Sequence, residues 1–233
     1  RLSFFQSKVL IKTLVFLGLR RSEAQAIRLG HVEYSDGLYH LRVQGKGSRE
    51  RRLPISPLLL ENWSRWIGRI LPGEEIPAKS FTEAPAGWLV FLKKHSEQPL
   101  FINTRARSFD QSLSTSEMGH IVRKVGRKAG IAFRVSPHML RATAITNALD
   151  AGATHRGVQQ MAGWTSPLMI SRYDKRLNDP KFSAVFHVKY AGWSVPQQTV
   201  KLATSVVQEQ ASREEGKSSN ERERNDFLTS DPV

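Results

Sequence analysis

Apolar residues recur at helical spacing in the first part of the chain. Between Ser3 and Leu17 they fall three or four positions apart, which is the period of a helix with one buried face. Gly18 follows directly, and glycine is common just past a helix C-terminus because it tolerates the left-handed conformation. Ser22, with Gln25 three residues further on, resembles a capping box. We therefore predict two consecutive helices, the second beginning at Ser22.

The pattern then changes to the two-residue alternation that is typical of β-strands. Strands are predicted at 32–34, 38–43 and 51–55. Asp36-Gly37 separates the first two, and this dipeptide strongly favours a tight hairpin turn. The sequence Gly45-Lys46-Gly47-Ser48 predicts a flexible loop tip before the third strand. Three short strands cannot form a core alone, so they must pack against helices.

Helical periodicity returns in the rest of the chain. It predicts helices at 58–71, 86–94, 115–129, 137–149, 155–162, 178–189 and a further one that begins at Pro167 and includes Tyr173. Ser136 and Ser166 each precede a proline, and a serine N-cap followed by proline is a common helix start. The expected fold class is therefore mainly α with a small three-stranded antiparallel β-sheet, an α+β arrangement.

Charge is the feature of the composition that bears most on function. The 233 residues include 35 Lys+Arg against 21 Asp+Glu, a formal net charge of +14. A basic surplus of this size favours a polyanionic partner such as DNA or RNA. The absence of cysteine excludes disulfides, thiolate metal sites and thiol catalysis. No apolar run approaches the roughly 20 residues that cross a bilayer, so we expect no membrane association.

Four short segments resemble motifs of the tyrosine recombinases, also called the phage-type integrase family, and they occur in the family's order. They are Gly18-Leu19-Arg20-Arg21-Ser22-Glu23, Gly45-Lys46-Gly47 with Arg51-Arg52-Leu53-Pro54, His138-Met139-Leu140-Arg141, and Gly163-Trp164 followed nine residues later by Tyr173. Each motif is weak alone, but their order and their predicted secondary structure strengthen one another. The resemblance covers about residues 5–180 and implies that residues 1–180 fold as a tyrosine recombinase catalytic domain.

The resemblance implies DNA cleavage and rejoining without a metal ion or any other cofactor. In this family a tyrosine oxygen attacks phosphorus, and a 3′-phosphotyrosyl link conserves the bond energy for the reverse step. Tyr173 is the implied nucleophile. Negative charge develops on the phosphate oxygens, so fixed cations are needed, and the planar guanidinium groups of Arg20 and Arg141 suit that role. Glu23 would orient one of these arginines.

Three further residues complete the implied catalytic set. His138 and Arg141 are three positions apart and so share a helix face, where His138 could accept the tyrosine proton or bind the phosphate. Lys46, on its flexible loop tip, could protonate the leaving oxygen as a general acid. Trp164 stands where many family members have a second histidine, and its indole N–H can still donate to a phosphate oxygen.

The resemblance also implies partners and a domain order. The expected partner is double-stranded DNA, bound by a homotetramer in the bacterial cytoplasm at the nucleoid, with no small-molecule substrate. Arg49, Arg51 and Arg172 are the candidate phosphate contacts. Residues 181–196 would be a C-terminal extension that packs on its own domain or on a neighbouring protomer. Residues 197–233 are expected to be disordered or ordered by a partner, and an N-terminal core-binding domain is expected to be missing.

Alternatives from other functional classes remain open at this point. A type IB topoisomerase would use the same chemistry but reseal the same strand. A catalytically silent DNA-binding relative would need a broken active site, and none of the six implied catalytic positions is broken. A basic RNA-binding module is disfavoured because no pattern of base-stacking aromatic residues is present.

Overall fold

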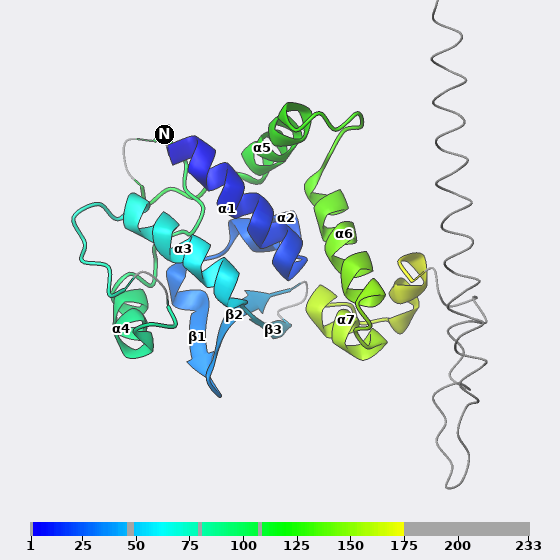
Figure 1. The fold of residues 1–233 in the computed structure, drawn as a ribbon, viewed down its shortest axis with the longest axis horizontal. Helices are drawn as coiled ribbons and strands as arrows, with labels where there is room; N and C mark the ends of the chain where they lie inside the picture. The colour runs from blue at the N-terminus through cyan, green and yellow to red at the C-terminus, as the bar shows by residue number, and fades with distance from the viewer. Residues whose placement is uncertain (1, 46–48, 79–80, 107–108, 175–233) are drawn as a thin grey trace, which may run out of the picture. The chain divides into compact units, whose positions relative to one another are not determined.

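The computed structural model describes residues 2–45, 49–78, 81–106 and 109–174 (Figure 1). Its α-helices are α1 (Leu2–Leu17), α2 (Arg21–Gln25), α3 (Pro57–Ile70), α4 (Pro85–Lys94), α5 (Thr115–Lys128), α6 (Pro137–Asp150) and α7 (His155–Ala162). Two short 3-10 helices, η1 (Leu29–His31) and η2 (Pro167–Arg172), accompany them. The predicted helix at 178–189, the extension at 181–196, the tail at 197–233 and Lys46 lie outside the described residues. None of the described helices is both long and apolar enough to cross a membrane.

The sheet is an antiparallel meander in the order β1 (Val32–Ser35), β2 (Leu38–Gln44) and β3 (Glu50–Pro54). Asp36 and Gly37 both have positive φ angles, 52° and 77°, as a two-residue hairpin turn of this kind requires. Leu41 pairs with Leu53 across β2 and β3, and both side chains are buried. The predicted fold class, mainly α with a three-stranded antiparallel sheet, is confirmed.

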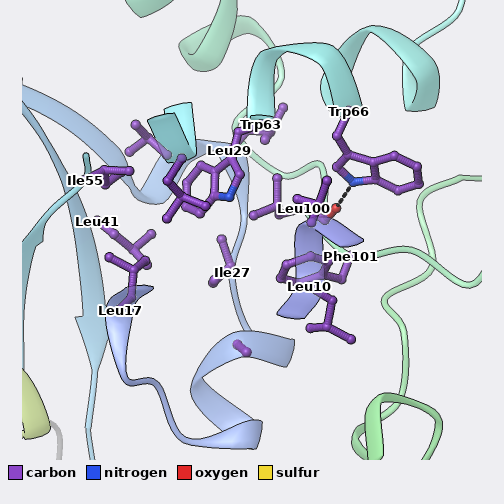
Figure 2. Close-up of a cluster of buried hydrophobic side chains, with 14 of the residues drawn as sticks. Leu10, Leu17, Ile27, Leu29, Leu41, Ile55, Trp63, Trp66, Leu100 and Phe101 are labelled. Atoms are coloured by element: carbon purple, nitrogen blue, oxygen red, sulfur yellow. Dashed lines mark hydrogen bonds between the residues drawn. The ribbon is translucent and has the colours of Figure 1, made fainter. Parts of the chain in front are cut away.

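Helix α1 lies in the middle of the described residues and packs against α3, α5 and α6 (Figure 1). The main hydrophobic core forms around α1. Figure 2 shows buried leucines of this core together with two tryptophans of α3. The indole of Trp63 donates to Thr13 Oγ1 at 2.9 Å, and that of Trp66 donates to the Leu100 carbonyl at 2.6 Å. These bonds satisfy the polar edge of two fully buried rings.

A second, smaller apolar cluster joins α6, α7 and η2. It consists of Ile145, Leu149, Val158, Ala162 and Ile170, with Trp164 and Tyr173 packed against it. Serine caps at Ser136 and Ser166 begin α6 and η2, as the sequence predicts. This cluster therefore supports the predicted nucleophile, and Met161 packs against both it and the main core.

Two local predictions are wrong. Ser22 and Gln25 do not form the capping box of α2: the helix begins at Arg21, and the Glu23 carboxylate caps it by accepting a hydrogen bond from the Arg20 backbone N–H at 2.7 Å. The segment after Pro167 is a 3-10 helix, and Tyr173 follows its last residue instead of lying inside an α-helix. Its backbone bonds are of the tighter i to i+3 type, including Tyr173 N–H to the Ile170 carbonyl at 2.8 Å.

Candidate active site

Glu23 is a buried carboxylate surrounded by arginines. Arg20 Nη1 donates to Oε1 at 2.8 Å, while Arg51 donates through two nitrogens at 3.0 and 2.8 Å. Arg141 Nη1 lies 3.8 Å from Oε2. Burial would raise the pKa of Glu23, but the hydrogen bonds from Arg51 and Arg20 outweigh it and hold the pKa below its ordinary value. Glu23 is therefore ionised at neutral pH and fixes the arginine side chains around it.

Arg141 is a buried cation held by backbone carbonyls. Its side chain is 5% exposed, and its two terminal nitrogens donate to the Gly18 carbonyl at 2.7 Å and the Ala162 carbonyl at 2.6 Å. These bonds join α6 to the ends of α1 and α7. Burial, with the nearby charge of Arg20, lowers the pKa of Arg141 to about 10, so the group stays charged at neutral pH. A guanidinium has more N–H groups than these two bonds use.

Arg20 occupies the N-cap position of α2, with an extended backbone. Gly18 ends α1 with a φ of 58°, and a Cβ there would lie 3.0 Å from Met161 Cε and 3.5 Å from Ala144 Cβ. The left-handed backbone therefore favours glycine at this position, and the end of the Met161 side chain would have to move slightly to admit a larger residue. The Arg20 side chain is 38% exposed, so it faces both Glu23 and solvent.

Arg51, on β3, links three elements. Besides its two bonds to Glu23, its Nε donates to the Met161 carbonyl in α7 at 3.1 Å. Its guanidinium packs on Gly163, where a Cβ would lie 2.8 Å from Nη1. The side chain is only 12% exposed. This geometry favours a role in holding Glu23 over the DNA contact that the sequence predicts for Arg51.

Tyr173 and Trp164 stack on each other at the edge of the smaller cluster. Their ring centroids are 5.2 Å apart and their planes differ by 27°. The Arg141 guanidinium carbon lies 5.9 Å from the Trp164 ring centroid. The structure thus brings Arg20, Glu23, Arg141, Trp164 and Tyr173 into one continuous group of contacts.

The other predicted residues lie outside this group. His138 is exposed in the first turn of α6, and within the described part of the chain its side chain makes no hydrogen bond or ion pair. Arg49 and Arg172 are also exposed. Lys46 falls between described segments, so its predicted role as a general acid remains a prediction.

A pocket of about 1840 Å³ opens beside the arginine cluster. Its lining includes basic side chains from the hairpin, the start of α2 and the start of α7: Arg20, Arg49, Arg51, Arg52, His155 and Arg156. Trp164 also lines it, whereas His138, Arg141 and Tyr173 do not. The pocket is therefore a basic approach to the cluster, with Arg20 and Trp164 at the boundary between the two.

One pair of polar residues in this region is not suggested by any sequence motif. His155 Nε2 and Asp174 Oδ2 lie 2.6 Å apart, and the Asp174 side chain is buried. Asp174 directly follows the predicted nucleophile. The pair spans 19 positions, so only tertiary structure reveals it.

Comparisons with known proteins identify the family of this chain. The model of the phage integrase family matches residues 4–179. A tyrosine recombinase XerC of Syntrophus aciditrophicus is 29% identical over 168 residues, which cover 72% of this chain and 48% of that protein. A tyrosine recombinase of Synechococcus elongatus is 32% identical over 167 residues, which cover 69% of this chain and 44% of that protein. The chain spans about half the length of the curated relatives it matches.

Solved structures show the same fold. XerH site-specific recombinase in a post-cleavage complex with palindromic difH substrate has a TM-score of 0.56 at 20% identity, covering 79% of this chain and 46% of that chain. XerA recombinase has a TM-score of 0.54 at 20% identity, and the match covers 80% of this chain and 64% of that chain. Both of these curated relatives are named as tyrosine recombinases, and neither is named as a topoisomerase. Because the family model matches most of the chain, residues 4–179, the chain belongs to the phage integrase family.

Proposed function

We propose that this chain carries the catalytic centre of a site-specific tyrosine recombinase, which cleaves and rejoins DNA with Tyr173 as the nucleophile. The observation that carries the proposal is the stacking of Tyr173 on Trp164 beside the buried, charged Arg141. A tyrosine next to a fixed guanidinium suits attack on a phosphodiester, because the cation stabilises the charge that develops on the phosphate oxygens.

The proposed step is a transesterification. Tyr173 Oη attacks phosphorus, the phenolic proton leaves, and the bond from phosphorus to the 5′ oxygen breaks. The products are a 3′-phosphotyrosyl link and a 5′-hydroxyl, and attack by another 5′-hydroxyl reverses the step. In this scheme His138 accepts the phenolic proton and Lys46 supplies the proton that the leaving oxygen takes up.

The arginines act on the phosphate in this proposal. Arg20 and Arg141 bind its non-bridging oxygens, and the Trp164 indole N–H donates a further hydrogen bond. Arg20 is suited to this because its side chain is part-exposed and lines the pocket. Glu23 and Arg51 hold Arg20 in place from the buried side.

The proposed partner is double-stranded DNA that enters the basic pocket, with Arg49 and Arg172 on its phosphates. The XerH structure, described as bound to difH substrate, supports a DNA partner. Exchange of two duplexes requires four cleavage sites, so we propose a homotetramer on DNA. The enzyme would work in the bacterial cytoplasm, at the nucleoid. Residues 1–180 would form the catalytic domain, and residues 181–196 an extension that packs on it or on a neighbouring protomer.

The proposal is tested with a pool of labelled, nicked DNA duplexes whose sequence is randomised around the nick. Cleavage of an intact bond a few nucleotides from the nick releases a short oligonucleotide that carries the 5′-hydroxyl. The covalent intermediate therefore cannot be resealed, and it accumulates. We expect labelled DNA to migrate with the protein on a denaturing gel. Recombination between two sites recovered from that pool would then separate a recombinase from a topoisomerase, which only relaxes supercoils. Absence of any covalent adduct across the pool would refute the proposal.

A further inference from the structure

Asp174, the residue after the proposed nucleophile, carries a buried carboxylate. Its side chain is 4% exposed, whereas that of its partner His155 is 47% exposed. An ionised carboxylate accepts and does not donate, so at 2.6 Å the imidazole Nε2–H is the donor. Removing a carboxylate from water is costly unless it is hydrogen-bonded. This pair therefore joins the backbone next to Tyr173 to the first residue of α7.

Helix α7 also binds the beginning of the segment that leads from Trp164 to Asp174. Gln159 Nε2 lies 3.2 Å from the Trp164 carbonyl and 3.3 Å from the Thr165 carbonyl. His155 and Gln159 are four positions apart, so they lie one above the other on one face of α7. Residues 164–174, here called the Tyr173 segment, are thus bound to α7 at their beginning by Gln159 and at their end by His155.

The hydrogen bonds within the Tyr173 segment do not connect its end to another element. Tyr173 and Asp174 both donate their backbone N–H groups to the Ile170 carbonyl, at 2.8 and 2.9 Å. Those bonds are local, so they shape the turn but do not attach it to another element. Ile170 is buried in the smaller cluster, while Leu168 and Arg172 are exposed. The bond between His155 and Asp174 attaches the end of the turn, beside Tyr173, to α7.

We propose that His155 is a positioning residue for the nucleophile: through Asp174 it holds the Tyr173 ring against Trp164, at the distance from Arg141 that attack on the phosphate requires. The inference rests on the proposed function, because the expected effect of His155 is on the rate of that reaction. Displacement of a reacting group by about 1 Å can cost roughly a hundredfold in rate. His155 also lines the basic pocket, so direct binding of a phosphate by His155 is the competing role.

The first test measures amide hydrogen exchange by mass spectrometry in the full chain without DNA, so it does not depend on cleavage. His155→Ala removes the donor, and we expect exchange in a peptide spanning 167–174 to become roughly tenfold faster, the effect of losing one hydrogen bond to a charged group. His155→Gln places an amide N–H near the position of Nε2 and should restore slow exchange. Arg156→Ala, at the neighbouring exposed position, is the matched control and should resemble the wild type.

The second test follows adduct formation on nicked duplexes at saturating DNA. His155→Ala should lower the rate of adduct formation at least tenfold with unchanged DNA affinity, and His155→Gln should recover most of that rate. Unchanged exchange in 167–174, or exchange that rises equally throughout α6 and α7, would overturn the positioning role. So would a loss of DNA affinity with no change in exchange. A wild-type chain that forms no adduct would refute the proposed function, and the exchange result would still decide the role of His155.

Discussion

At the scale of single residues, the site depends on one carboxylate with three cations around it. Glu23 accepts hydrogen bonds from Arg20 and Arg51, and Arg141 lies within 3.8 Å. Without Glu23 these guanidinium groups would repel one another in a partly buried space. The carboxylate therefore makes it possible to hold several cations close together before a phosphate arrives.

Replacing Glu23 with glutamine tests this role. Glu23→Gln keeps the shape of the side chain but removes its charge, and we expect the free energy of unfolding to fall by about 2–4 kcal/mol, because a buried charge cluster loses its counter-ion. Urea denaturation measures the change. Glu61→Gln, in the exposed pair with Arg65, is the control and should cost less than about 1 kcal/mol. Equal effects at the two positions would contradict the role of Glu23.

The lowered pKa of Glu23 predicts a pH dependence. A carboxylate whose folded pKa lies below its unfolded value stabilises the fold above the unfolded pKa, and this contribution is lost as pH falls through the folded pKa. The stability difference between wild type and Glu23→Gln should therefore be constant near neutral pH. It should shrink as the pH is lowered below the ordinary value of 4.5. Unfolding curves across that range provide the measurement, and a difference that grows in acid would contradict the assignment.

The sequence predicted the residue types of this site better than their contacts. Arg20, Glu23, Arg141, Trp164 and Tyr173 were identified through motifs, because each motif is local in the chain. The ion pair of Glu23 with Arg51 spans 28 positions and the pair of His155 with Asp174 spans 19. Such pairs depend on how α2, β3 and α7 pack, which no periodicity within a segment encodes.

At the scale of elements, the predictions succeed where signals are short-range. Asp36-Gly37 gives the hairpin, and the serine and proline at the start of α6 give that helix. The two errors concern the residue that caps α2, and the tight 3-10 turn that forms after Pro167 in place of an α-helix containing Tyr173. The packing of η2 and α7 around a second cluster could not be predicted, because both elements are short and their apolar residues fit either a local or a distant partner.

Gly163 tests how closely β3 approaches α7. It ends α7 with a φ of 63°, and a Cβ there would lie 2.8 Å from Arg51 Nη1. Gly163→Ala should destabilise the fold by about 2–4 kcal/mol, from a strained backbone together with displacement of Arg51. Gly152→Ala is the control, since Gly152 has a φ of 87° but nothing within 4 Å of its Cβ position. Thermal unfolding should show the larger loss at Gly163, and equal losses would mean that the contact with Arg51 is unimportant.

At the scale of the whole molecule, the effect of the net charge of +14 on DNA binding depends on where the basic side chains lie. Basic side chains of the hairpin and of α7 line one pocket beside the arginine cluster. Counter-ions released from DNA on binding make such an interface strongly dependent on salt. Composition alone predicts a polyanion partner, whereas the placement of these charges predicts where DNA binds.

The salt dependence of DNA affinity checks that placement. Arg49→Ala removes an exposed arginine from the pocket, and the slope of log affinity against log salt should become shallower by about 1. Fluorescence anisotropy with a random-sequence duplex measures it. Lys93→Ala, on the exposed side of α4, is the matched control and should leave the slope unchanged. A slope that responds to Lys93 but not to Arg49 would place DNA on a different face.

The identity of the nucleophile is the central claim, and mass spectrometry of the covalent adduct tests it most directly. Wild-type protein trapped on nicked duplexes would be digested with protease and nuclease, and the peptide that retains a nucleotide would be sequenced. We predict that the nucleotide is attached to Tyr173, and that Tyr173→Phe forms no adduct while binding DNA with nearly wild-type affinity. A nucleotide on Tyr34, Tyr39 or Tyr190, or an adduct that persists in Tyr173→Phe, would contradict the account.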